Sequence, residues 1–140
     1  MIDFVYNTDF QIENQGVFSK WLVEVAAAEN CLIHDLVFLF VSDQELLAMN
    51  KKYLKHNYFT DVITFGELEG DKISGNIAIS VDRVLDNSKT YGVGLDEELK
   101  RVMVHGLLHI IGYNDKTKKE KLTMSQKETD ALKMFHVKQV

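Results

Sequence analysis

The stretch from residue 96 to residue 115, DEELKRVMVHGLLHIIGYND, decides the fold. It opens with three acidic residues, Asp96, Glu97 and Glu98, which interact favourably with the amino-terminal end of a helix dipole. The predicted helix then runs to Gly112, a residue type common just after a helix end. Because its second half is apolar on all sides, we expect this helix to lie at the centre of the molecule.

Two histidines in this helix are spaced so that they can share one metal ion. His105 and His109 are four residues apart, so their rings project from the same helix face. Gly112 lets the chain turn sharply, and Asp115 can then bring a carboxylate oxygen to the same point. Two imidazoles and one carboxylate leave a fourth position for water, which is typical of a catalytic metal site rather than a structural one. The alternative is that both histidines are hydrogen-bonded core residues.

The segments on either side of this helix predict an α/β fold. Strands are predicted at residues 2–6, 32–41, 60–65 and 74–81, and further helices at 17–28, 42–53, 82–91 and 117–135. The apolar run 32–41 is expected to be a buried strand, and residues 66–72 a loop. Two S/T-x-x-E patterns, at residues 42–45 and 117–120, predict capping boxes. We therefore expect one domain over residues 1–140, an α/β sandwich with a single mixed sheet of about four strands packed with about five helices.

Composition excludes several classes of protein. The chain has 140 residues, of which 46% are hydrophobic and 26% charged, as in an ordinary globular domain. No apolar run reaches the ~18 residues that span a bilayer, and the first ten residues lack the features of a signal peptide. The single cysteine, Cys31, cannot form an internal disulfide, which favours the reducing cytoplasm.

The charge is distributed unevenly along the chain. The net charge of −5 argues against a whole-surface nucleic-acid binder, and neither a DNA nor a membrane partner is expected. Residues 1–70 carry 4 basic and 11 acidic side chains, whereas residues 71–140 carry 12 and 10. The second half could therefore bind an anion locally, although a solvent-exposed face rich in lysine explains the same pattern.

The histidine spacing also matches the metzincin-type metallopeptidases, H-E-x-x-H-x-x-G-x-x-H/D, at positions 105, 109, 112 and 115. Those enzymes use the glutamate after the first histidine as a general base. This chain has Gly106 there, and the acids at the start of the helix lie about two to three turns away. A peptidase is predicted only if a distant acid enters the site.

The sequence resembles the YbeY family of metal-dependent endoribonucleases, also called rRNA maturation factors. The resemblance rests on three blocks, HGLLHIIGYND at 105–115, NKKYLKHNYFTDVITF at 50–65 and SGNIAIS at 74–80. The second block is similar to the family's asparagine-containing helix end followed by a Thr-Asp-Val-hydrophobic-Ser/Thr-Phe strand. The third block looks like the family's Gly-Asp-Ile strand.

This resemblance implies a single-domain α/β protein in which His105, His109 and Asp115 bind one zinc ion. It implies a cytoplasmic enzyme that cleaves single-stranded RNA, matures 16S rRNA at its 3′ end and takes part in ribosome quality control. Ribosomal RNA and the small ribosomal subunit would be its partners.

Three positions depart from the family pattern. Asp115 stands where the family usually has histidine, and aspartate is itself a competent zinc ligand. Leu54 aligns with a position that commonly carries arginine, and Asn76 with one that is often aspartate. The missing arginine removes a candidate phosphate contact, which Lys55 or Lys51 could replace without the planar fork of a guanidinium.

For the RNA substrate that the resemblance implies, these residues suggest metal-assisted cleavage of a phosphodiester. A metal at the three ligands would lower the pKa of a bound water toward ~7 and polarise a phosphate oxygen. Lys55, Lys51 or Arg101 could hold the phosphate. Tyr113 could donate a hydrogen bond or pack at the helix end, Asp61 could orient a ligand imidazole or cap a turn, and His56 is a candidate substrate contact.

Three function classes stay open at this point. The first is a metal-dependent endoribonuclease. The second is a ribosome-associated factor that binds metal without cleaving RNA, favoured by the missing arginine and the lack of an evident general base. The third is a metallopeptidase, which the glycine after the first histidine disfavours.

Overall fold

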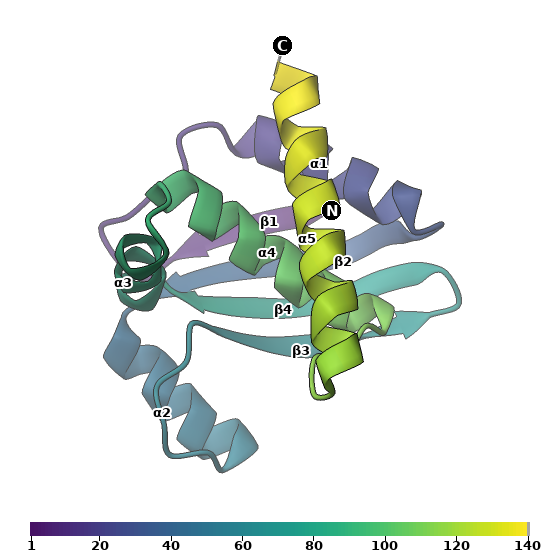
Figure 1. Ribbon diagram of the computed structural model, residues 1–140. Coiled ribbons are helices and arrows are strands. Elements are labelled where there is room, and N and C mark those ends of the chain that lie inside the picture. Colours follow the sequence, from purple (N-terminus) through teal and green to yellow (C-terminus); the bar gives the residue numbers. More distant parts are fainter. Residues whose placement is uncertain (140) are drawn as a thin grey trace.

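Four strands form one mixed sheet in the computed structural model, which describes the backbone of residues 1–139 and the side chains of residues 1–135. The strands are β1 (Ile2–Tyr6), β2 (Leu32–Val41), β3 (Val62–Glu69) and β4 (Lys72–Ser80), in the spatial order β1-β2-β4-β3 (Figure 1). The first three in this order are parallel, and β3 pairs antiparallel with β4 at the edge. The predicted mixed sheet of about four strands is confirmed.

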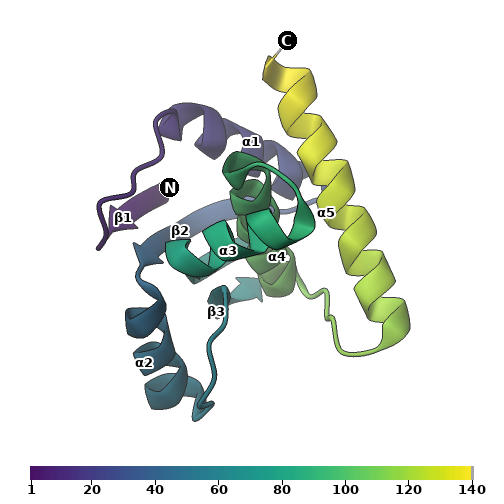
Figure 2. The ribbon, with the colours of Figure 1, turned by 60° about the vertical axis from the view of Figure 1, so that its left-hand side comes forward.

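Helices cover the two faces of this sheet unequally. Within the described part of the chain they are α1 (Gln15–Ala28), α2 (Asp43–Leu54), α3 (Val81–Tyr91), α4 (Leu95–Ile111) and α5 (Lys118–Gln139). Four of them lie on one side, where α1 and α4 pack on the sheet and α3 and α5 contact α4, while α2 alone lies on the other side (Figures 1 and 2). None of these described helices combines the length and the hydropathy that crossing a bilayer requires.

Strand β2 is buried only in its second half. Phe38 and Phe40 are fully buried in the main core beneath α1 and α4, whereas Val41 belongs to a smaller cluster under α2. At the other end Leu32 is 57% exposed and Asp35 is also exposed. The prediction of a buried strand over residues 32–41 is therefore wrong for its first half, because α2 contacts the sheet only near the carboxyl-terminal end of β2.

The predicted loop at residues 66–72 is also wrong. Both strands continue through it as a hairpin, with Glu67 opposite Ser74 and Glu69 opposite Lys72. The chain reverses at Gly70, whose φ of +65° is readily adopted by glycine. The extension is polar because this end of the hairpin is exposed to solvent, so hydrophobic alternation does not mark it as a strand.

The predicted helix ends are largely confirmed. The Thr117 hydroxyl accepts from the Glu120 amide at 3.0 Å, and the Glu120 carboxylate accepts from the Thr117 amide at 2.9 Å, as expected for a capping box. Ser42 accepts from the Glu45 amide at 3.2 Å. The Glu45 carboxylate, however, accepts from the side chain of Asn7.

Helix α4 is the central helix, as predicted, and it lies very close to the sheet. Leu99, Met103 and Leu107 are almost completely buried in the main core. At Gly106 an added Cβ atom would lie 2.8 Å from Cγ2 of Ile77 and 3.1 Å from the Thr64 hydroxyl oxygen. A side chain at position 106 would thus point into the sheet, which explains why glycine is required there.

Gly106→Ala is therefore expected to destabilise the protein. Overpacking of this kind costs about 1–3 kcal/mol, which exceeds the gain of ~1 kcal/mol from the better helix propensity of alanine. Urea unfolding measures the difference. Gly16→Ala in α1 is the matched control, because nothing lies within 4 Å of its added Cβ atom and its stability should be unchanged or slightly higher. Equal stabilities of the two variants would contradict the close approach of α4.

Candidate metal centre

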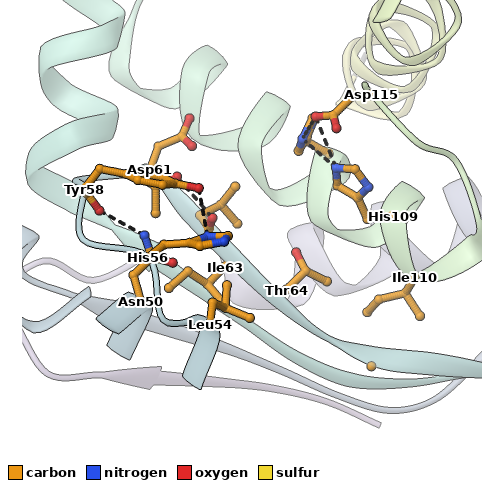
Figure 3. A pocket seen from close by; sticks show the side chains of 14 residues that line it. Asn50, Leu54, His56, Tyr58, Asp61, Ile63, Thr64, His109, Ile110 and Asp115 are labelled. Carbon is orange, nitrogen blue, oxygen red and sulfur yellow. Dashed lines mark hydrogen bonds and ion pairs between the residues drawn. The ribbon is translucent and has the colours of Figure 1, made fainter. Parts of the chain in front are cut away.

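His105, His109 and Asp115 meet at the carboxyl-terminal end of α4 and in the loop that follows it. Figure 3 shows two of them, His109 and Asp115, pointing toward each other. The Nε2 atoms of the two histidines are 3.0 Å apart, and Oδ2 of Asp115 lies 3.3 Å from Nε2 of His105 and 3.4 Å from Nε2 of His109. Gly112 ends the helix with a φ of +126°, and its amide donates to the carbonyl of Leu108. This turn brings Asp115 back toward the two imidazoles, as the spacing predicts.

These three distances suit a single tetrahedral ion. With metal–ligand bonds of ~2.0–2.1 Å, tetrahedral ligand atoms lie ~3.3 Å from one another. The observed separations of 3.0, 3.3 and 3.4 Å lie close to that value. Two Nε2 lone pairs that face each other at this distance repel unless a proton or a cation lies between them. The donor set and its spacing therefore fit a divalent metal ion such as zinc.

Glu128 of α5 holds His105 from the side away from the other candidate ligands. Its Oε2 atom lies 2.6 Å from Nδ1 of His105, and its Oε1 atom accepts from Nη1 of Arg101 at 2.9 Å. A carboxylate beside Nδ1 fixes the tautomer, so the lone pair of Nε2 faces His109 and Asp115. The sequence suggested Asp61 for this orienting role, but Asp61 instead accepts a 3.5 Å hydrogen bond from Asn87.

The sequence does carry a signal for Glu128. It lies on the buried face of α5, and only 7% of its surface is exposed. The buried residues Met124, Ala131 and Phe135 stand four, three and seven positions from it, which is the spacing of one helix face. A buried acid within an apolar helix stripe needs a polar partner in the core. The sequence pattern could therefore have identified Glu128 as a candidate site residue.

Negative charge accumulates around the candidate ligands. Burial alone would lower the pKa of His105, but its hydrogen bond to Glu128 and the charges of Glu128 and Asp115 outweigh burial and raise that pKa. Burial raises the pKa of Asp61, more than the charge of His105 lowers it. Burial, and then the charge of Asp61, raises the pKa of Glu98 to about 7. Such a concentration of carboxylates favours the binding of a cation.

The raised pKa of Glu98 predicts a pH-dependent stability. Its folded-state pKa of about 7 lies above the ordinary glutamate value of 4.5. Between these two pH values the folded state therefore binds more protons than the unfolded state, and stability falls as pH rises. Glu98→Gln removes the buried charge and should raise the free energy of unfolding at pH 8 by about 1–3 kcal/mol. At pH 4 the variant and the wild type should be equally stable. Urea unfolding with a chelator present measures both, and a gain that does not depend on pH would contradict the assignment.

A cavity of about 510 Å³ opens in front of the candidate ligands (Figure 3). The ligands line one side of it, and Asp61, from the segment before β3, is also among the lining residues. Leu54, His56 and Tyr58 line the other side, from the end of α2 and the segment that follows. Among the described residues that line the cavity there is no lysine or arginine.

The other residues singled out in the sequence lie outside this cavity. Lys55 is exposed at the end of α2 and is not among the residues that line it, so its phosphate contact stays a prediction. Arg101 is engaged by Glu128. The Tyr113 hydroxyl donates to Glu29, so this tyrosine serves the structural role that was one of its two interpretations. Asn76 lies on the face of the sheet that carries α2.

Fold and site together define an α/β protein with a candidate mononuclear metal centre at the end of its central helix. A family model described as "Endoribonuclease YbeY" matches residues 4–136. The chain belongs to this family, as its sequence motifs predicted.

Individual relatives agree with this assignment. A protein of Flavobacterium psychrophilum named "Endoribonuclease YbeY" is 44% identical over 139 residues, which cover 99% of each chain. One of the same name from Karelsulcia muelleri is 46% identical over 128 residues, or 91% of each chain. The solution structure of TM1509 from Thermotoga maritima has the same fold, with a TM-score of 0.69 and 24% identity over 96% of this chain and 89% of that one.

Proposed function

We propose that this chain is a zinc-dependent endoribonuclease that cleaves single-stranded RNA in the cytoplasm. Its substrate would be ribosomal RNA of the small ribosomal subunit, where it would mature the 3′ end of 16S rRNA and contribute to ribosome quality control. The observation that carries the proposal is the group of His105, His109 and Asp115 beside a cavity, in a chain of this family. The names of its relatives supply RNA as the substrate class.

Each residue of the group has a defined task in this proposal. The three ligands would hold zinc, and Glu128 would keep the ring of His105 in the orientation that exposes Nε2. A bound zinc ion supplies Lewis acidity toward a phosphate oxygen and a water that ionises near neutral pH. Without a cation the nearby carboxylates of Asp61 and Asp115 would repel a phosphate, so we expect RNA binding as well as cleavage to need the metal.

Metal removal and restoration test the proposal. Purified protein is treated with a chelator, dialysed and reloaded with Zn²⁺ or Mg²⁺, and each sample is incubated with a single-stranded 16S rRNA 3′ fragment and with a hairpin of equal length. Cleavage should disappear with the chelator, return with Zn²⁺ and spare the paired region of the hairpin. Cleavage that persists in the chelator would point to a contaminating ribonuclease. If no cleavage beyond this background depends on added metal, the proposal is refuted.

A ribosome-associated factor that does not cleave RNA is the second candidate. The observation that favours it is the lack of lysine and arginine among the described residues lining the cavity. Protein that holds zinc and binds the RNA fragment, yet cuts it no faster than the metal-free sample, would establish this alternative. An unfolded protein substrate in the same assay tests the metallopeptidase.

A further inference from the structure

The wall of the cavity that faces His109 and Asp115 carries a stacked pair of rings. His56 and Tyr58 have ring centroids 5.1 Å apart and an angle of 20° between their planes. The Tyr58 hydroxyl and Nδ1 of His56 are 2.8 Å apart and hydrogen-bonded. Both side chains line the cavity, and Tyr58 is 55% exposed (Figure 3). A large aromatic surface is thus open to whatever occupies the cavity.

Hydrogen bonds to the buried residue Asn50 hold the backbone of this pair in place. Asn50, of which only 1% is exposed, donates from Nδ2 to the carbonyl of Tyr58 at 2.9 Å. The amide of His56 donates to the carbonyl of Asn50 at 3.1 Å. Between them Lys55 has a φ of +58°, a left-handed conformation that is uncommon outside glycine. A buried amide and an unusual turn therefore fix two exposed aromatic rings beside the candidate metal centre.

The described residues that line the cavity offer no positive charge to attract the phosphates of RNA. On this wall, aromatic stacking is therefore the main source of affinity for RNA. No described lining residue is a lysine or an arginine, and Asp61 and Asp115 are acidic. Leu54, next to the pair, adds apolar surface where the resemblance led us to expect arginine. Proteins that bind single strands use aromatic rings as platforms for the faces of unpaired bases.

We propose that His56 and Tyr58 form a nucleobase-stacking platform that holds an unpaired base next to the phosphate to be cleaved. This inference rests on the proposed endoribonuclease function and adds to it the residues that select single-stranded substrate. A base in a duplex already has stacking partners on both faces, so it reaches this platform only after it leaves the stack. The platform therefore gives a physical reason for a preference for single strands.

Binding of a short single-stranded 2′-O-methyl RNA that contains 2-aminopurine tests the platform on zinc-loaded protein. Tyr58→Leu should weaken binding about 5- to 150-fold, which corresponds to the ~1–3 kcal/mol lost with one base–aromatic stack. Tyr58→Phe keeps the ring and should stay within about threefold of the wild type. Tyr53→Leu is the matched control, since Tyr53 is 56% exposed yet does not line this cavity.

A second measurement uses the unchanged protein. An RNA in which the stacked base is replaced by an abasic residue should bind wild-type protein as weakly as Tyr58→Leu binds the intact RNA. When the abasic RNA is combined with Tyr58→Leu, the loss of affinity should be little larger than with either change alone. Wild type that cleaves natural RNA while Tyr58→Leu binds as tightly as Tyr53→Leu would overturn the platform and leave the endoribonuclease standing. Wild type that neither binds nor cleaves RNA would overturn both.

Discussion

His109→Ala is expected to abolish both metal binding and RNA cleavage. The variant keeps only His105 and Asp115 as candidate ligands, and two ligands do not define the position of an ion. The loss should exceed the ~10–100-fold that follows removal of an outer-shell partner. Metal content measured by mass spectrometry should fall from about one zinc per chain toward zero, and cleavage of the single-stranded fragment should fall below detection.

His34→Ala is the matched control for this experiment. His34 lies in β2, and its side chain is 64% exposed, with Asp35 as its charged neighbour. Prepared identically, this variant should keep the metal and the activity of the wild type, and it carries any contaminating ribonuclease at the same level. Full metal content in His109→Ala would contradict the ligand assignment. Loss of metal with undiminished cleavage would instead contradict its role in catalysis.

The sequence predicts the parts of the fold that depend on local patterns. Helix α4 is found because an acidic start, an apolar second half and Gly112 all lie within one stretch. The end of the β3–β4 hairpin is missed because the strand there faces water, so Glu67 and Glu69 resemble loop residues. The exposure of Leu32 also depends on where α2 packs, which no local pattern encodes.

The candidate site, like the fold, has residues that local sequence patterns predict and residues that only long-range packing brings in. His105, His109 and Asp115 lie within eleven residues, so helix geometry and one turn are enough to bring them together. Glu128 is 23 positions from His105 and reaches it only because α5 packs across α4. The same packing pairs Arg101 with Glu128, whereas the sequence alone indicated Arg101 as a candidate phosphate contact. Contacts between distant elements are therefore what sequence reasoning lacked.

Glu128→Gln is expected to lower zinc affinity or the rate of RNA cleavage about 10- to 100-fold. The carboxylate uses Oε2 for His105 and Oε1 for Arg101. A glutamine side chain has one acceptor oxygen and cannot serve both donors. If that oxygen turns to Arg101, the amide nitrogen faces Nδ1 of His105 and no longer holds the tautomer in which Nε2 is free to bind metal. Zinc affinity is measured by competition with a chelator, and cleavage at saturating zinc.

Two further variants separate an effect on His105 from a loss of stability or of phosphate binding. Asp130→Asn, on the same helix but hydrogen-bonded only to Gln126 among the described side-chain contacts, should leave both quantities unchanged. Arg101→Met removes the second partner of Glu128 but keeps the carboxylate on His105, so it should lower zinc affinity less than Glu128→Gln does. A larger loss of zinc affinity in Arg101→Met would contradict the orienting role of Glu128. A larger loss of cleavage at saturating zinc would mean that Arg101 itself contacts phosphate, because that contact does not depend on how His105 is held.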